Sequence, residues 1–203
     1  YFYKKIGWGG MIKLAIQLIP DALKLFRGIP KMVLLIEFQA DTPEEVAHNV
    51  HAMRMDMTEY NHKALFEEDE TEAKSRKFWI MRRESFSLLR TKVKDKHTAP
   101  FMDDLVVPPH VLPQFLPEIR AVIKKYKLLA TIAGHMGDGN FHIIPLMNIE
   151  RQEEKDKLEP AMLEINAIVL KYKGSLSGEH NDGMIRGPWL QDMYGPEVFS
   201  YFK

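Results

Sequence analysis

Apolar and polar positions along the chain follow two periodicities, one typical of strands and one typical of helices. Short continuous apolar runs predict buried strands, and apolar residues at three- and four-residue spacing predict amphipathic helices. The strand-like runs span 31–39, 62–66, 128–134 and 141–146. The helical stretches begin at Pro43 and cover 68–92, 111–127 and 150–173, and a Pro-bounded extended segment lies at 101–109.

Local signals predict where two of these helices begin and end. Thr42 can cap a helix, Pro43 suits its first position, and Glu45 completes a capping box. We expect Pro160 to bend the helix at 150–173, because proline has no N–H to donate and its ring crowds the preceding turn. Gly174 is a usual helix stop.

Helices and strands alternate along the chain, and two of the strands form a hairpin. This order predicts an α+β fold with an antiparallel sheet covered by helices. A chain of 203 residues suits one domain with a sizeable core, so we expect a single domain over 1–203. Within it, we expect 1–30 to form an N-terminal lead-in helix. The chain opens with Tyr1, which indicates a fragment of a larger protein or a trimmed product.

Composition narrows the classes of function. The 28 basic and 28 acidic residues give a formal net charge of zero, which disfavours nucleic-acid binding. The absence of cysteine excludes disulfides, iron–sulfur ligation and thiolate zinc sites within this chain. It also fits a reducing compartment, and we expect a cytoplasmic location. The chain has no GxGxxG or GxxxxGK run, so we expect no phosphate cradle for a nucleotide in these residues.

The apolar stretch Met11 to Arg27 falls short of a membrane span, because Lys13, Asp21 and Lys24 interrupt it. A helix that faces the core or another subunit is the favoured interpretation. Peripheral contact with the inner membrane or with an electron acceptor is an alternative, and so is a homo-oligomer.

Two histidines flank the predicted hairpin turn. Asp138 and Gly139 favour a two-residue turn, which would place His135 opposite His142. Directly opposed side chains share a face of the sheet, with Cβ atoms about 4.5–5.5 Å apart. Two imidazoles at this spacing can bind one metal ion, and a longer turn would still allow them to approach. Alternatively, both are surface residues or hydrogen-bonded core groups.

A third candidate ligand lies in the segment Gly174 to Gly183 (GSLSGEHNDG). Glu179 could complete a set of two imidazoles and one carboxylate, which suits zinc, manganese or iron(II). His180 would then lie next to the metal and point elsewhere. A nearby cation favours the neutral imidazole, which can take a proton from a substrate hydroxyl. The alternative is an ordinary polar loop.

The segment His135 to His142 (HMGDGNFH), followed by Ser177 to Gly183 (SGEHNDG), resembles the C-terminal domain of FAD-linked oxidases. This group includes D-lactate dehydrogenases, the flavoprotein subunit of glycolate oxidase and D-2-hydroxyglutarate dehydrogenase. Residues 78–82 (FWIMR), 104–108 (DLVVP) and 31–39 are similar to further family segments. The resemblance covers about residues 31 to 203.

The resemblance implies an antiparallel, ferredoxin-like cap that closes over a flavin. The FAD is bound mainly by another domain or companion chain. His135, His142 and Glu179 match metal ligands, His180 matches a general base, and Arg82 matches an arginine that binds the substrate carboxylate. The expected activity is FAD-dependent oxidation of a small 2-hydroxy acid similar to D-lactate or glycolate, with hydride transfer to the flavin.

The sequence leaves several alternatives to this hypothesis open and departs from the family pattern at several positions. Arg83 competes with Arg82 for the role at the substrate carboxylate. Met102 and Ile144 stand where family members that act on dicarboxylates tend to carry Lys and Asn, which disfavours 2-hydroxyglutarate. Asn181-Asp182 replaces the more frequent glycine–hydrophobic pair after Glu-His. A free-standing metal-binding module or subunit without redox activity is the main alternative. A metal-dependent hydrolase is weakened by the lack of an HExxH helix.

Overall fold

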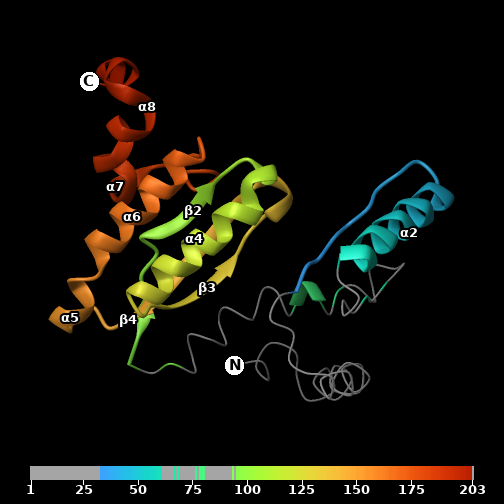
Figure 1. The fold of residues 1–203 in the computed structure, drawn as a ribbon, viewed down its shortest axis with the longest axis horizontal. Helices are drawn as coiled ribbons and strands as arrows, with labels where there is room; N and C mark the ends of the chain where they lie inside the picture. The colour runs from blue at the N-terminus through green and yellow to red at the C-terminus, as the bar shows by residue number, and fades with distance from the viewer. Residues whose placement is uncertain are drawn as a thin grey trace. The chain divides into compact units, whose positions relative to one another are not determined.

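The structure is a computed structural model that describes residues 33–60, 66, 68, 76, 78–80, 93 and 95–202. The chain divides into two compact units, residues 1–86 and residues 87–203, and each is described by itself. The second unit contains the sheet, the helices that cover it and the candidate site (Figure 1).

The sheet of the second unit is built around its longest strand, β4 (Asn140–Met147). Leu146 pairs with β1 (His97–Thr98) along one edge and with β3 (Leu129–Ala133) along the other. β2 (Met102–Val106) pairs with the first half of β4, on the edge shared with β1. Every pairing is antiparallel. The predicted α+β fold with an antiparallel sheet is therefore confirmed.

Two helices pack against this sheet and against each other, α4 (Leu112–Lys125) and α6 (Leu158–Lys171). Their buried positions recur every three to four residues and meet alternate residues of β4. The helices contribute Phe115, Ile119, Val122, Ala161, Ile165 and Val169, and β4 contributes Phe141, Ile143 and Met147. Each large side chain that is fully buried in this way stabilises the fold by about 1.5–3 kcal/mol.

The predicted helix at 150–173 is two helices, α5 (Gln152–Lys155) and α6. Pro160 accounts for this interruption, as predicted, and the break lies at 156–157, one turn before the proline. A proline ring clashes with the carbonyl four residues earlier, which here belongs to Asp156. The helix is interrupted at that point, and Pro160 lies in the first turn of α6, where its missing N–H has no intrahelical partner to lose.

The C-terminal segment follows α6 and returns to the sheet through an isolated bridge between Ser175 and Val106. It continues as α7 (Gly183–Arg186), a 3₁₀ turn η4 (Gly187–Trp189), α8 (Leu190–Phe199) and a last turn η5 (Ser200–Phe202). A further 3₁₀ turn, η2 (Pro109–Val111), precedes α4. The bridge at Ser175 brings the segment that holds Glu179 and His180 to the edge of β2.

In the first unit, α2 (Pro43–Tyr60) begins where the capping signal predicts. The backbone N–H of Glu45 donates to Thr42 Oγ1 at 3.3 Å. The strand predicted at 31–39 was wrong over its described part, because 33–39 form no strand and pair with no other described segment. Apolar sequence alone does not make a strand when no partner accepts its backbone hydrogen bonds.

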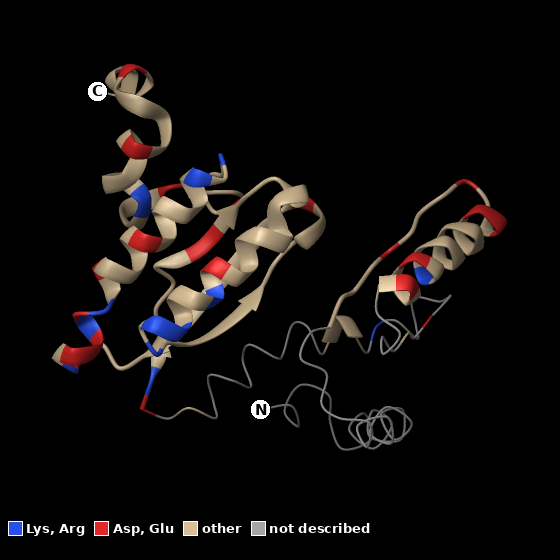
Figure 2. Cartoon of the chain, viewed as in Figure 1, with Lys and Arg blue, Asp and Glu red and all other residues tan. Residues whose placement is uncertain are grey.

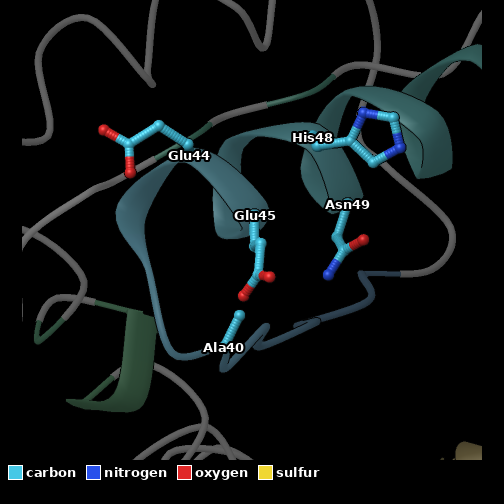
Figure 3. A pocket seen from close by; sticks show the side chains of 5 residues that line it. All are labelled: Ala40, Glu44, Glu45, His48 and Asn49. Atoms are coloured by element: carbon cyan, nitrogen blue, oxygen red, sulfur yellow. The ribbon is translucent and has the colours of Figure 1, made fainter.

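An open depression of about 440 Å³ lies beside α2. Figure 3 shows Glu45 and Asn49 extending from α2 toward the segment at Ala40, whereas His48 points away. The depression is lined by Ala40, Glu44, Glu45, His48 and Asn49 and includes none of the candidate site residues.

Several predictions fall outside the described residues, namely the lead-in helix at 1–30, the strand at 62–65 and most of the helix at 68–92 with Arg82 and Arg83. Residues 76 and 78–80 are helical, in agreement with that last prediction. Among the helices that the structure describes, none is both long and apolar enough to cross a membrane.

Candidate metal centre

A bulge in β2 orients two neighbouring carboxylates. The register against β4 shifts between Met102 and Leu105, so β2 carries one extra residue at Asp103-Asp104. Asp104 adopts a left-handed backbone conformation with φ 66°. Figure 2 shows the pair as the red part of β2. The bulge lets Asp103 contact His142 on β4 while Asp104 bonds to the C-terminal segment.

Asp104 anchors the segment that carries Glu179 and His180. Its buried carboxylate accepts hydrogen bonds from the backbone N–H groups of Gly178 at 2.8 Å, Glu179 at 3.1 Å and His180 at 2.9 Å. Asn140 Nδ2 donates a further bond at 2.9 Å. Burial raises the pKa of Asp104, but these donors outweigh it and lower the pKa to about 2. The carboxylate is therefore ionised at neutral pH. As an anion surrounded by these N–H groups, it holds the segment that carries Glu179 and His180 in place.

Gly178 allows this close approach. A Cβ atom there would lie 2.6 Å from Val106 Cγ2 and 2.7 Å from Asn140 Nδ2. Arg186 of α7 holds the same segment from its other side. Its guanidinium donates to the backbone carbonyls of Leu176 at 2.8 Å, Asn181 at 2.8 Å and Asp103 at 2.7 Å. One arginine thus ties both ends of the segment to β2.

The connection between β3 and β4 is longer than the predicted two-residue turn. Ala133, and not His135, lies opposite His142, and a 3₁₀ turn η3 (Met136–Asp138) occupies the connection. The prediction of directly opposed histidines was therefore wrong. Gly139 is drawn toward the end of β2, where its carbonyl accepts a bond from the N–H of Val107 at 3.0 Å. The two imidazoles still approach, with ring centroids 6.2 Å apart.

Gly139→Ala is expected to destabilise the domain by about 3 kcal/mol, because φ is +69° and the new Cβ would lie 1.8 Å from the carbonyl oxygen of Val107. Urea unfolding followed by circular dichroism measures the loss. Gly187→Ala is the matched control, since its Cβ would meet nothing within 4 Å and its φ is helical. Equal stability of the two variants would contradict the close packing of Gly139.

Three imidazoles converge on one carboxylate oxygen. Glu179 Oε1 lies 2.9 Å from His142 Nε2 and 3.5 Å from His135 Nε2. His180 Nε2 lies 3.7 Å from the same oxygen. His180 was expected to point away from the other three residues, but its ring stacks on that of His142 at 4.8 Å, with 10° between the planes. The structure therefore brings all four sequence-predicted residues of this set together, and Arg82 lies outside the described residues.

A carboxylate that sequence reasoning missed completes the cluster. Asp103 Oδ1 lies 2.9 Å from His142 Nδ1, and Asp103 Oδ2 lies 3.2 Å from His180 Nδ1. Asp104 also brings a ligand-type atom within 4.8 Å of those of His142, Glu179 and His180. Its oxygens already accept hydrogen bonds from the backbone N–H groups of Gly178, Glu179 and His180. We therefore assign Asp104 the role of anchoring this segment. Two adjacent carboxylates within the otherwise apolar run at 101–107 were the sequence signal for both residues.

The cluster thus provides imidazole nitrogens and a carboxylate oxygen beside β2 and the first half of β4, a donor set suited to a divalent cation. Comparison with known proteins gives the family. Residues 11–203 match the family described as FAD linked oxidases, C-terminal domain, and the chain belongs to this family.

Curated relatives carry the names of 2-hydroxy-acid oxidoreductases. D-2-hydroxyglutarate dehydrogenase of Pseudomonas putida is 29% identical over 169 residues, which is 82% of this chain and 16% of that protein. Glycolate oxidase subunit GlcD of Bacillus subtilis is 29% identical, covering 44% of this chain and 19% of that protein. Probable mitochondrial D-lactate dehydrogenase of Danio rerio is 28% identical, covering 51% of this chain and 21% of that protein. The chain thus spans about a fifth or less of each relative's length.

Proposed function

We propose that this chain is the substrate- and metal-binding part of an FAD-dependent enzyme that oxidises a small 2-hydroxy acid. His135, His142 and Glu179 would hold a divalent cation. The observation that carries the proposal is the approach of imidazole nitrogens from two different residues to one oxygen of Glu179. The names of the curated relatives support the substrate class.

The spacing of the donor atoms is compatible with a metal site. In a tetrahedral site with bonds of about 2.0–2.1 Å, neighbouring ligand atoms lie about 3.4 Å apart. The distances of 2.9 Å and 3.5 Å from Glu179 Oε1 to the two imidazole nitrogens bracket this value. Two nitrogens and one oxygen suit zinc, manganese or iron(II), and they leave coordination positions for a substrate.

When bound, the cation supplies a Lewis acid that lowers the pKa of the substrate hydroxyl, and FAD supplies the hydride acceptor. Through the cation that they would hold, His135, His142 and Glu179 would position the hydroxyl end of the substrate. His180 accepts the hydroxyl proton at Nε2, the nitrogen that faces the cluster. Arg82 would bind the substrate carboxylate through a bidentate pair.

The chain requires a flavin partner for this activity, either a further domain of the same polypeptide or a companion chain. Met102 is 1% exposed and belongs to the hydrophobic core, so this position gives no information on whether the substrate carries a second carboxylate.

Cobalt(II) titration of the chain tests the proposal, since visible absorption reports the ligands around cobalt. We expect tight binding and a spectral change on adding D-lactate or glycolate, which can chelate through hydroxyl and carboxylate. Acetate, which has no hydroxyl, should produce a much smaller change. Absence of cobalt binding would refute the metal centre. Cobalt binding with no response to either 2-hydroxy acid would instead favour a metal-binding module without this substrate.

A further inference from the structure

We propose that Asp103 is a positioning residue that fixes the tautomer and the orientation of two imidazoles at once. Its carboxylate accepts one hydrogen bond from Nδ1–H of His142 and one from Nδ1–H of His180. Both Nε2 atoms are then unprotonated and face Glu179. This inference rests on the proposed function, because the two imidazoles that Asp103 would orient are a proposed metal ligand, His142, and the proposed proton acceptor, His180.

The distances support one bond for each carboxylate oxygen. Asp103 Oδ1 is 2.9 Å from His142 Nδ1, and Oδ2 is 3.2 Å from His180 Nδ1. A carboxylate offers only acceptors, so an imidazole bonds to Asp103 only through a protonated Nδ1, and this tautomer leaves Nε2 free to bind a cation beside Glu179. The Asp103 side chain is 13% exposed, which leaves little water to compete for these bonds.

The stacking of the two rings explains how one carboxylate can serve both. His142 and His180 lie nearly parallel, with centroids 4.8 Å apart, so their Nδ1 atoms lie on the same side of the stack. Their Nε2 atoms lie on the opposite side, 2.9 Å and 3.7 Å from Glu179 Oε1. Rotation of either ring would lose its bond to Asp103.

The backbone around Asp103 is held independently of the imidazoles. Arg186 Nη2 donates to the carbonyl of Asp103 at 2.7 Å, and the bulge in β2 sets the direction of the side chain. A carboxylate behind a metal-binding histidine fixes its tautomer and raises its basicity. Asp103 would orient His180, the proposed proton acceptor, in the same way.

Nuclear magnetic resonance of the chain labelled with ¹⁵N-histidine tests the tautomers without metal. The measurement uses the Glu179→Ala chain, so that Glu179 does not compete for the proton of His142, at a pH where the imidazoles are neutral. Two-bond proton–nitrogen couplings distinguish Nδ1–H from Nε2–H, and His142→Gln and His180→Gln assign the signals. We expect Nδ1–H on both rings. An Nε2–H tautomer on either ring would overturn the proposal.

Asp103→Asn in the same background gives a sharper result. The amide has one acceptor and one N–H₂ donor, so one of the two rings should switch to Nε2–H. His135, whose ion pair is with Glu179 and not with Asp103, should keep the signals that it has in the Glu179→Ala chain. Retention of Nδ1–H on both rings would contradict the role of Asp103. If this variant does not fold, the tautomers of the Glu179→Ala chain alone decide.

Zinc affinity then separates this inference from the proposed function. With Glu179 present, Asp103→Asn should weaken zinc binding about 10–100-fold, as is usual for the loss of such a partner. Asp103→Glu, which keeps two acceptors, should restore part of the affinity. Zinc binding that is unchanged in Asp103→Asn would refute the positioning role and leave the metal centre intact. Failure of the wild-type chain to bind zinc would refute the metal centre, and the tautomers would still test Asp103.

Discussion

Replacing Asp104 with asparagine is expected to destabilise the domain by about 3 kcal/mol. Asparagine has nearly the same shape, but it offers one oxygen where the carboxylate offers two. Its N–H₂ group would face either the N–H groups of Gly178 and His180 or those of Asn140 and Glu179. These donors bond to a buried anion in the wild-type chain, and hydrogen bonds to charged groups contribute about 1.5–3 kcal/mol each. The large cost follows because the donors cannot turn to other partners.

Urea unfolding measures this loss, and Asp192→Asn on the exposed side of α8 is the matched control. The control should change stability by less than about 0.5 kcal/mol. The Asp104 variant should also bind less metal, because the segment with Glu179 and His180 loses its anchor. A stability equal to that of the control would show that Asp104 does not hold this segment.

Replacing His142 with alanine is expected to reduce the metal content from about one ion per chain to a small fraction. His142 is the more buried of the two proposed imidazole ligands, with 15% of its side chain exposed against 47% for His135. Its Nε2 is also the nitrogen nearest to Glu179 Oε1. Its loss therefore removes the central donor and leaves too few ligands for tight binding.

Elemental analysis after dialysis against zinc measures the metal content, and His135→Ala and Glu179→Ala should give the same result. His110→Ala is the matched control, because His110 is an exposed histidine of the same unit in η2. It should retain the full metal content. Equal zinc in the wild type and in the His135 and His142 variants would refute the ligand assignment.

Local sequence signals predicted the elements that form the body of the second unit. The helix expected at 111–127 is α4, and the strands expected at 128–134 and 141–146 are β3 and β4, each within one or two residues. These elements have regular apolar spacing, and local propensity agrees with their final packing. The segment at 33–39 has the same apolar character, but strand formation also depends on a distant partner that local sequence does not reveal.

In the candidate site too, residues that lie close together in the sequence were predicted, whereas residues that depend on contacts distant in the sequence were not. The sequence identified four of the site residues because they lie in two short, distinctive segments. One segment contains His135 and His142, and the other contains Glu179 and His180. Asp103 and Asp104 act through residues that follow them by 36 to 77 positions, as the separation of Asp104 from Asn140 and of Asp103 from His180 shows. The bulge that orients them depends on the register with β4, which no periodicity along the chain encodes.

The isolated bridge between Ser175 and Val106 marks a division within the domain. The four strands, α4 and α6 all precede it in the chain, whereas Glu179 and His180 follow it. An ion shared by His142 and Glu179 would therefore act as a reversible cross-link between the completed body of the domain and its tail. By mass action, a rising free-ion concentration would then add to the attachment of the tail that Asp104 and Arg186 already provide, and protease resistance of the tail would rise with ion occupancy.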